Sequence, residues 1–168
     1  MPLIIISILF AGLCYKFANW ENWYIYYPTI TFYIIVSLTS HIVTYNISLW
    51  SIPVLIGNDS LSEYYIVCFI FPSIILLFLS NYPKQPFKKI AYLFSFVFIL
   101  SLIEYVSYLG KYIFYGHGWT IGWSILLYIG MFMMIRLHYK KPLFAWLLFF
   151  PIVVAGMLYF NISLNDLK

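Results

Sequence analysis

Six stretches of about 20 mostly apolar residues take up most of this chain. At a rise of 1.5 Å per residue, a helix of that length crosses a hydrocarbon core of about 30 Å. The stretches cover residues 2–18, 28–46, 61–80, 90–109, 119–137 and 142–160. They predict an all-α fold: a polytopic transmembrane helix bundle of about six spans, in which residues 1–168 form a single domain.

The composition supports a membrane location. Of the 168 residues, 64% are hydrophobic and only 8% are charged, whereas a water-soluble domain carries about 25% charged residues on its surface. The apolar excess excludes a disordered chain, and without a basic patch a nucleic-acid-binding domain is excluded too. The chain has two cysteines, Cys14 and Cys68, which is too few for a disulfide scaffold.

Proline, glycine and asparagine separate the apolar stretches, and the connections are too short for a soluble domain. Residues 47–57 are apolar but too short to span, so we expect them in the interface or as a shallow re-entrant segment. The first stretch, which ends near Cys14, has a signal peptide or lipobox as its alternative reading. Because no basic residue precedes it and Leu13 is not small, we expect a retained helix.

The nine basic residues predict the orientation. With six spans, the connections after the first, third and fifth spans lie on one side of the membrane. That side holds Lys16, Lys84, Lys88, Lys89, Arg136, Lys140 and Lys141, and the opposite side holds Lys111 and Lys168. Basic connections stay in the cytoplasm, so both termini are expected outside.

Several short phrases, spread over most of the chain, carry a resemblance. They are Asn22-Trp23 with Tyr27-Pro28-Thr29, Leu49-Trp50, Leu79-Ser80-Asn81-Tyr82-Pro83, Ile103-Glu104-Tyr105, Gly118-Trp119 with Trp123-Ser124, and His138-Tyr139-Lys140-Lys141-Pro142. In these phrases the chain resembles an uncharacterised family of small polytopic membrane proteins of spore-forming Gram-positive bacteria, of the Bacillus and Clostridium type. The resemblance implies a plasma-membrane location and a shared fold, and it implies no activity.

Among the acidic and basic side chains inside predicted spans, where a charge at mid-depth costs about 2.5–3.5 kcal/mol, His41 and Glu104 stand out because they lie farther from the span ends than the others. Glu104 and His41 each precede the outer end of their span by five residues, or roughly 8 Å along a helix. Serine, threonine and tyrosine residues lie at helical spacing from Glu104 and from His41, so each of the two helices carries a polar stripe. We therefore expect the two stripes to face each other.

Two interpretations of this pair stay open. In the first, His41 and Glu104 form a hydrogen bond or ion pair that fixes helix packing. In the second, they line an outward-facing site that handles a proton, binds a head group or holds a divalent metal. His117 from the following outer connection, and Asp59 and Glu63 around the start of the third span, lie on the same side. On the second interpretation Glu104, His41 and His117 are the candidate catalytic residues.

Metal and nucleophile chemistry have less support. His41, Glu104 and His117 suit zinc by residue type, but no short motif places two ligands on one helical turn, so we expect no metal site. No serine lies in a Gly-x-Ser-x-Gly turn, and both cysteines lie in apolar runs. No cofactor is expected.

The basic connections are first of all anchors whose side chains reach toward the head groups. As an alternative, they capture a phosphate-bearing lipid or nucleotide. The candidate head-group ligands are Arg136, Lys140, Lys141, Lys84, Lys88 and Lys89.

The sequence therefore favours a small plasma-membrane protein that is not an enzyme and that works through helix packing with itself or with another membrane component. Membrane lipids are expected partners and nucleic acids are not. A lipid- or head-group-directed enzyme or binder at His41 and Glu104 is the alternative. A small transporter is the third class, although the chain has no internal repeat of the kind that carriers show.

Overall fold

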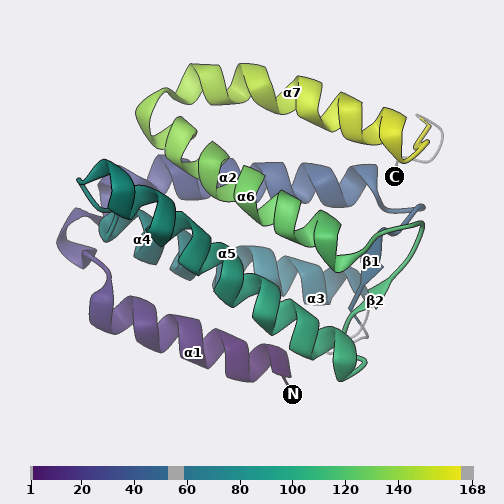
Figure 1. Ribbon diagram of the computed structural model, residues 1–168, viewed down its shortest axis with the longest axis horizontal. Coiled ribbons are helices and arrows are strands. Elements are labelled where there is room, and N and C mark those ends of the chain that lie inside the picture. Colours follow the sequence, from purple (N-terminus) through teal and green to yellow (C-terminus); the bar gives the residue numbers. More distant parts are fainter. Residues whose placement is uncertain (1, 53–58, 164–168) are drawn as a thin grey trace.

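The computed structural model describes residues 2–52 and 59–163. In this part of the chain, helical segments pack in alternating directions as an all-α bundle (Figure 1). The helices are α1 (Pro2–Phe17), α2 (Trp23–Val43), α3 (Asp59–Tyr65), α4 (Phe71–Ser80), α5 (Pro86–Leu109), α6 (Ile121–Lys140) and α7 (Pro142–Tyr159). The helix ends lie within about five residues of the predicted span ends, so the predicted fold class is confirmed.

Four helical segments of the described chain are long and apolar enough to cross a membrane one by one. They are Leu61–Ser80, Pro86–Leu109, Ile121–Lys140 and Pro142–Tyr159. The segments that correspond to the first two predicted spans, 2–18 and 28–46, are Leu3–Phe17 and Trp20–Val43. They pass the same test only as a pair bent by 92°, which allows up to five spans in place of six. The chain is a multi-pass membrane protein by these criteria.

The bend between α1 and α2 has a local cause. A short 3-10 helix (Trp20–Asn22) joins them, and Asn19 caps it by accepting a hydrogen bond from the backbone N–H of Asn22 at 3.3 Å. The indole Nε1 of Trp20 donates to the carbonyl of Cys14 at 3.0 Å, which folds the turn back onto α1. Both helices then pack against α4.

The third predicted span is one continuous helical segment with a wide turn in its middle. Between α3 and α4, residues Ile66–Ile70 form a π-helix, and the backbone N–H of Phe71 bonds to the carbonyl of Ile66. Pro72 follows directly, and proline has no N–H and crowds the carbonyl four residues before it. A local π-turn relieves that crowding.

The core lies around α4. Phe78, Ile75, Phe132 and Ile135 are fully buried, and the rings of Phe78 and Phe132 lie 4.6 Å apart. The outer faces of α5 and α7 keep most of their large apolar side chains exposed, as expected for helices that face lipid.

The bundle has two different ends (Figure 1). The basic end holds the connections α1–α2, α4–α5 and α6–α7. The sheet end holds strands β1 (Trp50–Ser51) and β2 (Phe114–Tyr115), which pair antiparallel with Trp50 opposite Tyr115. Residues 47–52, expected in the interface or as part of a re-entrant segment, thus lead into a short strand; residues 53–57 of that segment lie outside the described residues.

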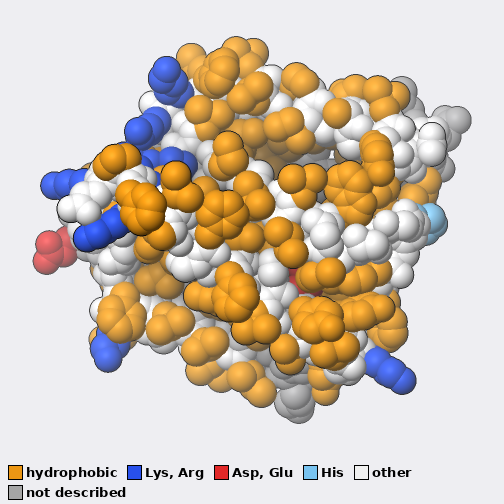
Figure 2. Space-filling model, viewed as in Figure 1, with side chains coloured by type: hydrophobic (Ala, Val, Ile, Leu, Met, Phe, Trp, Pro, Cys, Tyr) orange, Lys and Arg blue, Asp and Glu red, His pale blue; other side chains and the backbone are white. Residues whose placement is uncertain are grey.

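Basic side chains gather at the basic end, on the left in Figure 2. Of the nine lysines and arginines, Lys111 lies beyond α5 at the sheet end and Lys168 is outside the described residues, which leaves seven at the basic end. The predicted grouping of the basic connections on one side is therefore found in the fold.

Candidate functional site

The carboxylate of Glu104 is the centre of a buried polar cluster near the sheet end. Glu104 lies on α5 and its residue is 8% exposed. Its Oε1 accepts hydrogen bonds from the hydroxyls of Tyr115 at 2.6 Å and Ser124 at 2.5 Å, and its Oε2 accepts one from Tyr128 at 2.5 Å. Hydroxyl groups from three side chains thus surround both oxygens of this carboxyl group.

The three donors come from two elements that follow α5 in the chain. Ser124 and Tyr128 are four residues apart on α6, so they share one face of that helix, and Tyr115 lies on β2. The indole Nε1 of Trp119 donates to the hydroxyl of Ser124 at 2.9 Å and extends the cluster by one step. Glu104 therefore joins α5, α6 and the sheet.

Tyr115 is the outermost of these donors. Burial, followed by the hydrogen bond to Glu104 and its negative charge, raises the pKa of the Tyr115 hydroxyl well above its ordinary value. The hydroxyl therefore keeps its proton and remains a donor to the carboxylate across the physiological pH range. Its ring stacks on Tyr108 with centroids 4.7 Å apart.

A pocket of about 380 Å³ opens over this cluster. It is lined by Tyr105, Tyr108, Tyr115, Trp119, Thr120 and Ile121. Two of its walls, Tyr115 and Trp119, are also members of the Glu104 cluster, so the carboxylate lies directly behind the aromatic wall.

The loop between β2 and α6 holds the pocket in shape. The backbone N–H of Gly116 donates to the carbonyl of Leu49 at 2.9 Å, and a Cβ at Gly116 would lie 2.8 Å from the carbonyl oxygen of Ser48. Only glycine fits this approach. The Trp50 and Trp119 rings then meet at 4.9 Å across the two segments.

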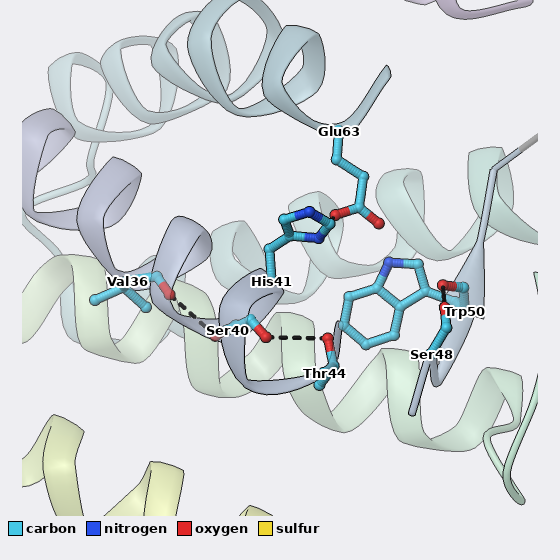
Figure 3. Close-up of polar contacts among 7 residues, drawn as sticks. All are labelled: Val36, Ser40, His41, Thr44, Ser48, Trp50 and Glu63. Atoms are coloured by element: carbon cyan, nitrogen blue, oxygen red, sulfur yellow. Dashed lines mark hydrogen bonds and ion pairs between the residues drawn. The ribbon is translucent and has the colours of Figure 1, made fainter. Parts of the chain in front are cut away.

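His41 does not join Glu104. The described partners of Glu104 are the three hydroxyls, and His41 forms an ion pair through its Nδ1 with Oε2 of Glu63. Figure 3 shows the imidazole at the end of α2 facing the carboxylate on α3. The expected His41–Glu104 pair is therefore wrong. The last turn of α2 faces the first turn of α3, whereas α5, which carries Glu104, packs against α6.

His117 also lies apart from both groups. It is exposed, adopts a left-handed backbone with φ of 48°, and its Nδ1 lies 2.9 Å from the carbonyl of Ser48. Within the described residues no three His, Cys, Asp or Glu side chains come close enough to hold a metal ion. The side chain of Asp59 and the whole of Asp166 lie outside the described residues.

The candidate head-group ligands share the basic end but differ in their contacts. The guanidinium of Arg136 lies over the ring of Tyr82 at 4.2 Å and over that of Tyr139 at 5.2 Å, a cation–π arrangement that joins α6 to the α4–α5 connection. Lys84 lies in that connection, and Lys88 and Lys89 lie in the first turn of α5. Lys140 is the last residue of α6, and Lys141 lies between α6 and α7.

Comparison of the chain with protein families, curated proteins and solved structures finds no match. The resemblance to the family from spore-forming bacteria therefore stays a prediction.

The sequence pointed to Glu104 but not to its partners. Tyrosine is abundant here, with 17 in the chain, so Tyr115 and Tyr128 did not stand out from the aromatic residues expected at membrane interfaces. The usable signal was Ser124 and Tyr128, two hydroxyls at i and i+4 on an otherwise apolar helix face.

Proposed function

We propose that this chain is a plasma-membrane protein that binds a positively charged organic group in the pocket over Glu104 and carries out no chemistry on it. The ligand class is an ammonium group, carried by a lipid head group or by a free amine. The observation that supports this is the pocket walled by Tyr105, Tyr108, Tyr115 and Trp119 with the Glu104 carboxylate behind it.

The physical argument concerns charge. Aromatic faces attract cations by about 0.5–2 kcal/mol each, more when water is excluded. A carboxylate behind the wall adds a Coulomb attraction that is stronger in this partly buried place than in water. Because the hydroxyls of Tyr115, Ser124 and Tyr128 hold the carboxylate in place, it provides a fixed negative field.

The orientation is part of the proposal. With the basic end in the cytoplasm, the sheet end and its pocket face outward. We keep the six crossings predicted from the sequence, with α1 and α2 crossing separately, and this topology puts both termini outside. Alkaline phosphatase fused after Lys168 should be active and a fusion after Lys89 silent. The reverse pattern contradicts the outward-facing pocket.

The binding test compares choline with 3,3-dimethyl-1-butanol, which has the same shape without the charge. Binding to the purified protein in detergent is followed by tryptophan fluorescence, and choline should bind at least tenfold more tightly. Tyr105→Leu removes an exposed wall residue outside the Glu104 cluster and should weaken choline about fivefold. The control is Tyr15→Leu, which replaces an exposed tyrosine of α1 outside the pocket. This variant should bind choline as tightly as the parent chain. Equal binding of the two compounds contradicts the proposal.

The source of the cation is decided by a second arm of the same experiment. Native mass spectrometry of the protein purified from its own membrane should show a co-purifying lipid with an ammonium head group if a lipid is the ligand. If free choline binds and no such lipid is present, the ligand is a soluble amine.

A second function has its own supporting observation. The three hydroxyl donors make Glu104 a joint between α5, α6 and the sheet, which favours the role in helix packing with this chain or another membrane component. On that account choline does not bind and therefore does not stabilise the protein, and purified protein runs as an oligomer that Tyr128→Phe weakens.

A further inference from the structure

A second pocket, of about 410 Å³, lies at the basic end between α2 and α7. Its walls are the α2 segment from Tyr27 to Ile35 on one side and Pro142 and Trp146 of α7 on the other, and His138 of α6 forms its floor. From Tyr27 to Ile35 the helix rises about 12 Å. The pocket is therefore a groove that runs from the membrane interface into the hydrocarbon region.

The floor of this groove is a polar side chain in an apolar setting. His138 is 6% exposed, and its ring stacks on Phe32 with centroids 4.1 Å apart. Its Nδ1 lies 3.0 Å from the hydroxyl of Thr29. Its Nε2 has no hydrogen bond to any described residue, so one polar ring atom remains for a ligand in the groove.

Two basic residues adjoin a wall of the groove in the chain. Lys140 and Lys141 directly precede Pro142, one of the wall residues, and basic side chains dominate this end of the molecule (Figure 2). The acid at this end whose side chain the structure describes is Glu21, exposed on the turn between α1 and α2. Arg136 is held over Tyr82 and Tyr139, so the two lysines are the cations at the mouth.

We infer that this groove binds an anionic phospholipid, with an acyl chain between α2 and α7 and the phosphate at Lys140 and Lys141. Apolar walls of this depth match a hydrocarbon chain, and the charge at the mouth matches an anionic head group. The site lies at the opposite end from the pocket over Glu104 and takes a ligand of opposite charge. Failure of one proposal therefore leaves the other standing.

The experiment uses the full chain in detergent, mixed with equal amounts of dioleoylphosphatidylglycerol and dioleoylphosphatidylcholine, and native mass spectrometry counts the retained lipids. Phosphatidylglycerol should be retained preferentially. The double variant Lys140→Gln with Lys141→Gln should lower that preference roughly 30-fold, since each lysine near the membrane contributes about 1 kcal/mol.

A second variant tests the groove without changing any charged residue. Thr31→Phe places a ring in the groove and should reduce retention of phosphatidylglycerol at least tenfold. Its control, Thr39→Phe, makes the same change two turns further along α2, outside the groove, and should retain the lipid. Equal retention by the two variants overturns the inference.

A third arm separates the acyl chain from the head group. Glycerol 1-phosphate carries the phosphate without a tail, and it should not displace phosphatidylglycerol at equal concentration. Displacement at equal concentration overturns the inference, because the groove would then contribute nothing to binding.

Discussion

The two ends of this bundle hold their charged groups in opposite ways. At the sheet end one carboxylate, that of Glu104, is enclosed by three hydroxyls from α6 and β2. At the basic end seven cations lie on connections and near helix ends, where they can reach solvent and lipid head groups. Hydrogen bonds hold the Glu104 carboxylate in place at the sheet end. The cations of the basic end are placed by their positions near helix ends. Single substitutions should therefore damage the sheet end far more than the basic end.

The largest effect is expected for Glu104→Ala. Three hydroxyls, of which that of Ser124 is buried and those of Tyr115 and Tyr128 are partly buried, lose their acceptor together. The free energy of unfolding should therefore fall by about 3–5 kcal/mol. The measurement is equilibrium unfolding in mixed detergent micelles. Glu21→Ala at the basic end removes an exposed acid and serves as the control, with a change of less than about 0.5 kcal/mol. Equal losses of unfolding free energy for the two variants would contradict the claim that the sheet end is the more sensitive one.

Tyr128→Phe should cost less, about 1.5–3 kcal/mol, because it removes one hydrogen bond to a charged group and keeps the ring. In the background of Glu104→Ala the same change should cost almost nothing, since the acceptor is already gone. Strictly additive losses would show that the two side chains do not interact.

Gly116→Ala tests the loop that supports the pocket. The added Cβ meets the carbonyl of Ser48 at 2.8 Å, so the β1–β2 contact must shift at a cost of about 1–3 kcal/mol. Gly130→Ala is the matched control, because a Cβ at Gly130 on α6 meets open space and alanine favours a helix by about 1 kcal/mol. A neutral Gly116→Ala would mean that the sheet end adapts more easily than the packing implies.

The smallest effect concerns the basic end. Arg136→Lys keeps the charge and loses the planar group over Tyr82 and Tyr139, which should cost about 0.5–1 kcal/mol. Lys140→Arg, which has no such ring contact in the described chain, is the control and should change nothing measurable. A loss as large as that for Tyr128→Phe would show that the basic end also depends on one buried contact.

Hydropathy was sufficient to locate the helices, because a span is defined by its length and its apolar composition, and both can be measured on the sequence. It also marked Glu104, since an acid in an apolar span is rare. It could not identify the partners. Periodicity gives the polar face of each helix, but the neighbour of that face depends on helix rotation and order, and α6 faces α5 where α2 was expected.

The bent start of the chain shows a second limit. A sequence window scores residues 2–18 and 28–46 as two spans, whereas α2 begins at Trp23 with Pro28 inside it, and the pair bends by 92°. Two hydrogen bonds shape the bend: Trp20 donates one and Asn19 accepts the other. Composition and hydropathy do not predict such contacts between individual residues.

The central claim is that Glu104 places a fixed negative charge behind an aromatic pocket. Glu104→Gln tests it most directly, because the amide keeps the size of the carboxyl group and removes its charge. Its oxygen still accepts hydrogen bonds, and its NH2 group donates to a hydroxyl that turns to accept. We expect this variant to remain folded, to bind choline roughly tenfold more weakly than the parent chain, and to bind 3,3-dimethyl-1-butanol as before. An unchanged affinity for choline in the folded variant would contradict the account.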